Sequence, residues 1–168
     1  NEVKDREFIG YSYDGADASF ELLARRIIGE IPTYLTISEY DVSVKKNNKG
    51  KIISIAKAHI LVDGNEVVCE GEGNGPVNAL DNAIRKNVDK VGKYSKYLKD
   101  LKLVDYKVRI LNTGTEAITR VSIESTDSKG KNWFTIGVST NIIEASFKAL
   151  IDSLDYKLFK EQAPASKL

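Results

Sequence analysis

The chain has 168 residues, enough for one domain with a hydrophobic core or for one domain and a short arm. Its 25 basic and 24 acidic side chains nearly cancel, which disfavours a nucleic-acid-binding domain, since such domains usually carry a basic excess. No stretch is long enough to span a membrane, no signal peptide is recognisable, and the single cysteine, Cys69, cannot form an internal disulfide, so we expect a cytoplasmic protein.

Residues 1–32 are predicted to be a linker segment with one amphipathic helix, over about residues 16–29. Because the chain begins at Asn1 and contains no methionine, we interpret it as a piece of a longer protein. We expect the apolar stripe of this helix to pack on a neighbouring domain outside the chain. The stripe consists of Ala16, Phe20, Leu23, Ala24, Ile27 and Ile28.

Alternating apolar and polar residues predict three strands between residues 33 and 72. Residues 47–50 form the first turn, and Asp63-Gly64, a strong hairpin signal, forms the second. The third strand runs into residues 71–83, where the pattern changes to that of a helix.

Residues 71–83 contain three glycines within five positions, followed by Pro76, which suits the first position of a helix. The start of this helix presents free N–H groups and the positive end of the helix dipole, which suits a carboxylate or a phosphate. The alternative is that the glycines only make a tight turn.

The second half of the chain repeats the first at a shift of 66 residues, which places Tyr40 on Tyr106 and Gly71 on Gly137. We therefore predict an α+β regulatory domain over residues 33–160, built from two β-β-β-α units, residues 33–92 and 99–159, related by an internal pseudo-twofold axis. Its antiparallel sheets pack with helices and follow the linker helix. The second helix begins at Asn141 with the spacing of a capping box, and residues 161–168 are expected to be a polar tail.

Catalytic chemistry is poorly represented in this sequence. The single histidine, His59, lies in the middle of a strand, and the aspartates are scattered over a turn, a helix and a strand. No His, Cys or carboxylate cluster has metal-ligand spacing, and the glycine stretch lacks the Lys-Ser/Thr of a P-loop. We therefore expect a binding module without catalytic residues, metal or cofactor, or alternatively a pure dimerisation module.

Small and apolar residues around the two predicted helix starts suit a pocket for a small amphiphile, in which a few polar groups converge. The same residues could equally be core residues of the sheets. They are Val77, Leu103, Tyr106, Ile110, Ala117 and Ile142.

Several separated motifs resemble the C-terminal regulatory domain of the 2-isopropylmalate synthase and citramalate synthase family. Residues 73–83 (GNGPVNALDNA) resemble the family signature GNGPVDALDxA, and residues 103–110, 114–121 and 133–146 follow in the family's order. Residues 10–23 (GYSYDGADASFELL) look like the segment that joins barrel and regulatory domain in citramalate synthases, so we favour that branch.

This resemblance implies a homodimeric domain that binds the end-product amino acid and inhibits the parent enzyme by feedback, with the helix at residues 16–29 as candidate transmitter. The expected effector is isoleucine for a citramalate synthase, which condenses acetyl-CoA with pyruvate, and leucine for a 2-isopropylmalate synthase. The parent is implied to be a (β/α)₈ acyltransferase that uses a divalent metal and acetyl-CoA. This chain contains none of that barrel.

Carried onto this sequence, the family's effector site falls on the first helix start and on the second unit. Gly73, Asn74, Gly75, Val77 and Asn78 are implied to hold the carboxylate and amino groups of the effector, with Pro76 setting the turn. The pocket for its side chain is implied to be shaped by Leu103, Tyr106, Ile110, Ala117 and Ile142. The chain departs from the family at Thr140, where members often have proline, which leaves the effector preference open.

Overall fold

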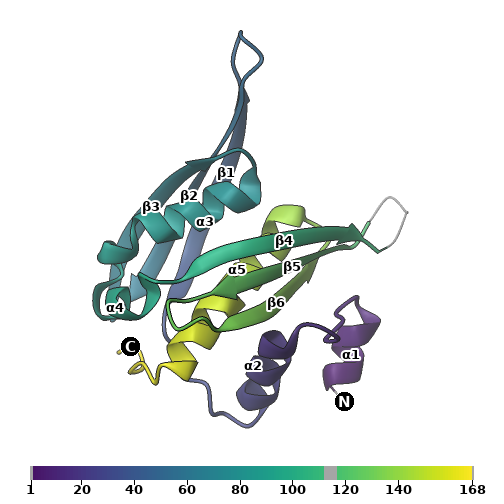
Figure 1. Cartoon of the computed structure of the whole chain (residues 1–168), viewed down its shortest axis with the longest axis vertical. Helices are drawn as coiled ribbons and strands as arrows, with labels where there is room; N and C mark the ends of the chain where they lie inside the picture. The colour runs from purple at the N-terminus through teal and green to yellow at the C-terminus, as the bar shows by residue number, and fades with distance from the viewer. Residues whose placement is uncertain (1, 112–116, 168) are drawn as a thin grey trace. The chain divides into compact units, whose positions relative to one another are not determined.

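Two antiparallel sheets of three strands each organise the computed structural model, which describes residues 2–111 and 117–167. The chain divides into two units. The β4–β6 unit comprises Asn1–Ile31 and Asp100–Lys157, and the β1–β3 unit comprises Pro32–Lys99 and Leu158–Leu168. In each unit a long helix follows the third strand (Figure 1), so the predicted α+β class with two β-β-β-α units is confirmed.

The β1–β3 unit consists of β1 (Thr36–Lys46), β2 (Ile52–Val62), β3 (Asn65–Gly73) and α3 (Pro76–Lys86). The predicted hairpin turn is present, because both of its central residues have positive φ, 51° at Asp63 and 76° at Gly64, as a two-residue turn of type I′ requires. The helix α3 lies along β3 and β2 and buries its apolar stripe on them (Figure 1).

The helix α3 ends at Lys86, earlier than its apolar pattern predicted. The amide of Asn87 donates to the carbonyl oxygens of Ala83 at 2.7 Å and of Glu70 at 2.9 Å, and so fastens the end of the helix to β3. Three short helical elements follow that the sequence pattern did not predict, η1 (Val88–Lys90), η2 (Gly92–Tyr94) and α4 (Ser95–Leu98).

The β4–β6 unit contains β4 (Lys102–Ile110), β5 (Thr119–Thr126), β6 (Asn132–Ser139) and, up to Lys157, the helix α5 (Ile142–Lys160). The helix packs on β5 and β6, where the hydroxyls of Ser125 and Ser153 lie 2.6 Å apart and Thr135 donates to the Ala149 carbonyl at 2.8 Å. Asn141 caps the helix as predicted, because its Oδ1 accepts the N–H groups of Ile143 and Glu144.

The internal repeat extends to irregular features of the backbone. The pairing of β1 with β2 shifts between Ile37 and Glu39, and the pairing of β4 with β5 shifts between Leu103 and Asp105. The two β-bulges are therefore at equivalent positions of the repeat, and each changes the face on which the following residues lie.

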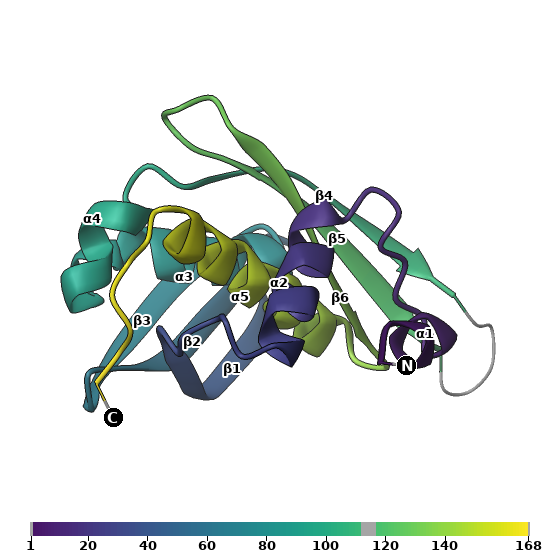
Figure 2. The ribbon, with the colours of Figure 1, turned by 90° about the horizontal axis from the view of Figure 1, so that it is seen from below.

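The N-terminal segment contains two helices, α1 (Glu2–Phe8) and α2 (Asp17–Ile27), of which only the second was predicted. The buried face was predicted only in part, since Ala16 and Leu23 are buried but Ile28 is 66% exposed, and the packing of the exposed residues on a neighbouring domain stays a prediction. The helix lies beside the edge strand β6 of its own unit (Figure 2), where the Ser19 hydroxyl accepts the N–H of Ile136 at 2.9 Å and donates to Asp152 at 2.9 Å. The buried residues are Ala18, Ser19, Leu22 and Leu23, whereas Phe20 and Ile27 are 45% and 52% exposed.

Residues near the C-terminus are fastened to the β1–β3 unit. The Tyr94 hydroxyl donates to the carbonyl of Pro164 at 2.8 Å, and the backbone N–H of Asp63 donates to the Ser166 hydroxyl at 2.8 Å. Among the described residues, no helix is both long and apolar enough to cross a membrane.

Candidate functional site

The predicted effector residues fall into two groups, one in each unit. Gly73 ends β3, residues 74 and 75 form the connection, and Pro76, Val77 and Asn78 make the first turn of α3. The second group lies in the β4–β6 unit, with Leu103, Tyr106 and Ile110 on β4, Ala117 just before β5 and Ile142 at the start of α5. The structure therefore places each group within a single unit, with Leu103 and Ile110 near opposite ends of β4.

The glycines of the first group have separate roles. A Cβ at Gly73 would lie 2.5 Å from the backbone N of Ala79, and a Cβ at Gly71 would lie 2.6 Å from the Cα of Ala83. The close approach that glycine permits is therefore made by α3 itself. Gly75 has extended backbone, with φ −158°, and open space around a Cβ, so neither packing nor conformation explains it.

The first turn of α3 has no side-chain cap. Its N-cap residue is Gly75, which has no side chain to accept the N–H groups of the turn, and Pro76 follows. The side-chain oxygen of Asn78 accepts the backbone N–H of Asn74 at 3.2 Å, and so holds the connection against the helix. The Val77 side chain is buried. The positive end of the helix dipole is thus available to an anionic group.

The second group is largely exposed, which argues against the alternative that these residues are core. Tyr106, Ile110 and Ile142 are 43%, 66% and 42% exposed. The β-bulge in β4 is essential to the group. Leu103 pairs with Ser125 and Tyr106 with Ile123, so the bulge places Leu103 and Tyr106 on one face although they are three positions apart in the sequence. Within their unit, the second group forms an apolar surface on and beside β4.

Part of one family motif, residues 114–116, lies outside the described residues. Asp81, which belongs to the glycine-stretch motif, is buried and accepts Arg85 Nε at 2.7 Å. Burial raises the pKa of Asp81, against the lowering effect of Arg85. This aspartate therefore acts within α3 and is not directed at the helix start.

His59 and Cys69, the single histidine and the single cysteine of the chain, lie in structural positions within the β1–β3 sheet. His59 Nδ1 lies 3.5 Å from the carboxylate of Glu66 on the neighbouring strand, and Cys69 is buried as a free thiol whose pKa burial raises. Within residues 2–111 and 117–167, no three His, Cys, Asp or Glu side chains are grouped so as to hold a metal.

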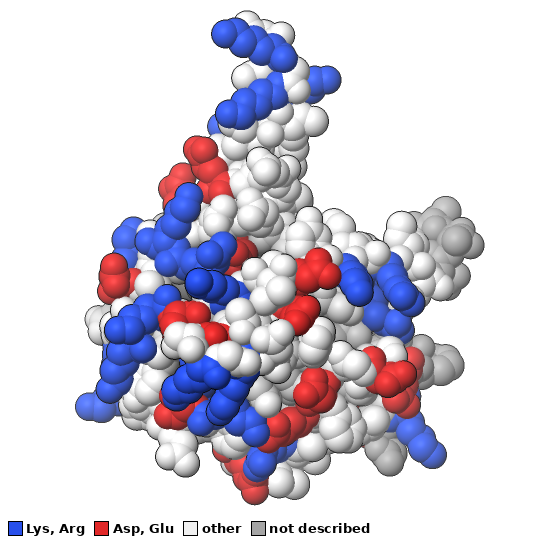
Figure 3. Space-filling model, in the orientation of Figure 1, with Lys and Arg blue, Asp and Glu red and all other residues white. Residues whose placement is uncertain are grey.

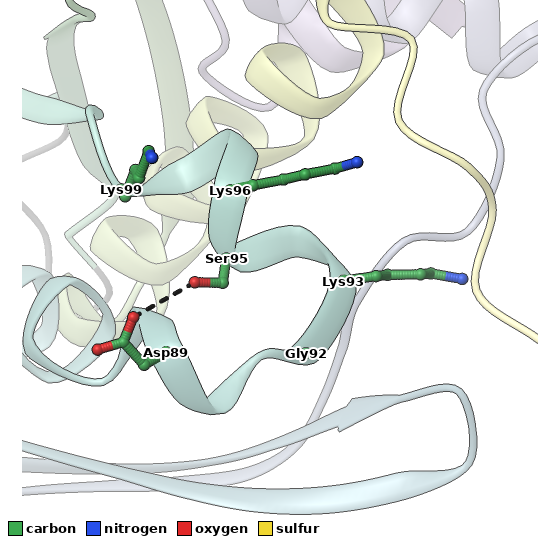
Figure 4. A pocket seen from close by; sticks show the side chains of 6 residues that line it. All are labelled: Asp89, Gly92, Lys93, Ser95, Lys96 and Lys99. Atoms are coloured by element: carbon green, nitrogen blue, oxygen red, sulfur yellow. Dashed lines mark hydrogen bonds between the residues drawn. The ribbon is translucent and has the colours of Figure 1, made fainter.

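A shallow cavity of about 460 Å³ lies in the β1–β3 unit, beside η1, η2 and α4 (Figure 4). Its side chains do not converge on one point. Lys93 and Lys96 point away from Asp89 and Ser95, which contact each other at 3.4 Å. Lys93 instead binds Asp63 at 2.8 Å and the Ala165 carbonyl at 2.6 Å. We conclude that this cavity is a hollow in the surface whose lysines serve the fold.

Comparison with known proteins gives a single family. The family model described as the LeuA allosteric (dimerisation) domain matches residues 14–158. The (R)-citramalate synthase of Geobacter sulfurreducens is 44% identical over 163 residues, which are 95% of this chain and 30% of the relative. The (R)-citramalate synthase of Aquifex aeolicus is 44% identical over 165 residues, 96% of this chain and 30% of the relative.

A 2-isopropylmalate synthase, from Clostridium acetobutylicum, is 36% identical over 106 residues, 62% of this chain and 17% of the relative. The chain thus spans about 30% of the length of the two citramalate synthases to which it is similar.

Proposed function

Because the chain belongs to the LeuA allosteric (dimerisation) domain family, we propose that it is the amino-acid-binding regulatory domain of a citramalate synthase. The observation that carries the choice of branch is the extent of the similarity. The match to proteins named (R)-citramalate synthase covers 95% of the chain at 44% identity, whereas the match to a named 2-isopropylmalate synthase covers 62% at 36%.

The parent enzyme in this proposal condenses acetyl-CoA with pyruvate in the cytoplasm, with the help of a divalent metal. That chemistry belongs to a catalytic barrel outside the present chain. The role of this domain is to bind isoleucine and thereby lower the activity of the barrel. Such control requires the effector to bind two arrangements of the enzyme with different affinity.

The two groups of residues have separate roles in this proposal. The open first turn of α3, at Gly75, Pro76 and Val77, suits the carboxylate of an amino acid. The exposed apolar surface around Tyr106 and Ile110 suits its aliphatic side chain. The family description supports a dimer, and β4, an edge strand with exposed apolar residues, is the surface that we assign to it.

Calorimetric titration of the chain with isoleucine, leucine and valine tests the proposal. Isoleucine should bind most tightly, by about 10- to 200-fold over the others, since the contacts of one methyl group in an apolar pocket are worth about 1–3 kcal/mol. Tyr106→Ala should abolish binding and leave the dimer intact. The matched control is Tyr40→Ala, the same change at the equivalent position of the repeat, which should bind isoleucine normally.

Other outcomes would identify the alternatives. Tighter binding of leucine would assign the chain to the 2-isopropylmalate synthase branch. A dimer by sedimentation that gives no heat and no thermal shift with any of the three amino acids would indicate a dimerisation module without ligand response, and would refute effector binding by this domain.

A further inference from the structure

A second cavity, unrelated to the effector site, lies in the β4–β6 unit. It has a volume of about 270 Å³ and is enclosed by residues 12–16 and by side chains of β4, β5 and β6. Lys107 and Arg109 come from β4, and Arg120 and Ser122 from β5. Figure 3 shows basic side chains gathered over the C-terminal end of β4, at the right of the view.

The strand register concentrates positive charge in this cavity. Arg109 pairs directly with Arg120 across the two strands, and Lys107 pairs with Ser122. Like charges at directly opposite positions destabilise a sheet. The proximity has an electrostatic signature, because burial and the neighbouring charge of Arg109 lower the pKa of Arg120. Arg120 is also fixed in place, since its Nε donates to the Gly10 carbonyl at 2.7 Å.

Among the residues that the structure describes, the positive charge lining the cavity is not neutralised. Three cationic side chains and one carboxylate, Asp14, line it, which leaves a net charge of two. In the part of the chain that the structure describes, Lys107 and Arg109 take part in no ion pair or hydrogen bond of their side chains.

Two other cations of this unit are matched by carboxylates. Arg26 binds Asp152 and Asp155, and Lys157 binds Asp127, at 2.8 Å in each case. Lys107 and Arg109 have no such partner among the described residues, and a bound anion would supply the missing negative charge.

We propose that this cavity binds a small oxyanion with two negative charges, of the kind presented by a phosphate or by a short dicarboxylate. Guanidinium groups bind such oxygens in a forked geometry, and the two arginines lie on neighbouring strands at the same level. The Ser122 hydroxyl, in the same wall, is a further donor. An anion here removes the repulsion between Arg109 and Arg120 and ties β4 and β5 to the segment that precedes α2.

This site is independent of the proposed effector site. The side chains of Lys107 and Arg109 lie on the opposite face of β4 from Tyr106 and Ile110, since neighbouring residues of a strand alternate in direction. Tyr106→Ala is thus expected to leave anion binding unchanged, and the failure of one proposal says nothing about the other.

The test is a titration of the 168-residue chain with inorganic phosphate and, separately, with malonate, at constant ionic strength maintained with sodium chloride. Amide chemical shifts identify where each anion binds. We expect shifts confined to residues 12–16, 107–109 and 120–122, and a dissociation constant below about 1 mM for at least one of the two anions. Binding of phosphate alone, malonate alone or both identifies the source of the oxyanion chemistry.

Two matched variants decide whether the cavity is responsible. Arg109→Gln removes one exposed cation of the site and should weaken binding by about tenfold or more, the size expected for a charge-assisted hydrogen bond. Lys102→Gln removes an exposed cation from the other end of the same strand and should change binding by less than about twofold. Equal effects of the two substitutions, or shifts that chloride reproduces at the same ionic strength, would overturn the proposal.

Discussion

At the scale of single residues, the most consequential charge is that of Asp155. Its carboxylate shares the Arg26 guanidinium with Asp152, and both contacts are 2.8 Å long. Asp155 Oδ1 is buried and has no hydrogen-bond partner. Burial, with a further contribution from the charge of Asp152, raises the pKa of Asp155 to about 7, because one shared cation does not offset both.

Asp155→Asn is expected to raise the free energy of unfolding at about pH 8 by about 1–3 kcal/mol. The folded chain keeps this proton up to about pH 7, whereas the unfolded chain loses it near its ordinary value of 3.8. The contribution of Asp155 to stability therefore falls as the pH rises from about 4 to about 7, and asparagine has no charge to bury. Urea unfolding at about pH 5 and pH 8 measures the difference, and the gain should shrink towards the lower pH.

The matched control is Asp152→Asn, in the same helix and on the same arginine. Both oxygens of Asp152 are satisfied, one by the Ser19 hydroxyl at 2.9 Å and the other by Arg26. We expect this variant to lose about 1–2 kcal/mol at pH 8. The interpretation of Asp155 is wrong if Asp155→Asn is also destabilised at pH 8.

Residue-level prediction from sequence succeeded where a pattern is local. The helix cap at Asn141 was predicted and is confirmed, whereas no prediction was made for Lys107 and Arg109. The cavity that they line was not predicted, because residues 12–16 close it from a distant part of the chain. The exposure of Tyr106 and Ile110 was left open between pocket and core, and only the position of the helix α5 over β5 and β6 decides it.

At the scale of elements, the repeat determines how each helix meets its sheet. Gly71 on β3 and Gly137 on β6 are equivalent positions, and at each the strand backbone touches the following helix. A Cβ at Gly137 would lie 2.8 Å from the backbone N of Ala149, just as a Cβ at Gly71 would meet Ala83. The same close contact between a strand glycine and a helix alanine therefore occurs once in each unit.

Gly137→Ala is expected to destabilise the chain by about 2–3 kcal/mol, since backbone atoms cannot move aside as the end of a flexible side chain can. Gly71→Ala should cost a similar amount because the contact is equivalent. Denaturant unfolding provides the measurement. Gly75→Ser is the control, because a Cβ there meets nothing within 4 Å and serine suits an N-cap, so its effect should stay within about 0.5 kcal/mol.

Most helices and strands could be predicted from the sequence, but the buried face of the helix α2 could be predicted only in part. The strands, their hairpins and the two long helices follow from periodicity and turn residues that recur in phase. The buried face of α2 was predicted from apolar residues alone. It includes Ser19, whose hydroxyl is matched by Asp152 and by the edge of β6. A polar side chain can be buried when its hydrogen bonds are satisfied. A local pattern of apolar residues does not show the hydrogen-bond partners that Ser19 finds elsewhere in the chain.

At the scale of the whole molecule, the exposed apolar side chains of the edge strand β4 indicate a surface for a partner. Its neighbour β5 is well buried on the face towards α5, with Val121 and Ile123 inaccessible, whereas β4 itself leaves Val104, Tyr106 and Ile110 exposed. The equivalent strand β1 also exposes apolar side chains, including Val44. An apolar edge strand of this length is a surface that proteins normally cover.

We predict that the chain is a dimer and that Ile110→Asp dissociates it. In a two-fold dimer the new carboxylate occurs twice at the interface, so the dissociation constant should rise by about 100-fold or more. Sedimentation over a range of concentrations measures it. Because Ile110 is 66% exposed within the chain, the substitution should leave the fold of each protomer unchanged by circular dichroism.

A substitution at Arg109, the residue before Ile110, is the control for the dissociation experiment. Arg109→Asp introduces the same side chain one position earlier on β4, on the opposite face of the strand, and should remain dimeric. If both variants dissociate, the strand edge as a whole forms the contact and the assignment to its apolar face is wrong. If neither dissociates, the dimer forms through another surface, and the exposed side chains of β4 are then free to act solely as the wall of the effector pocket.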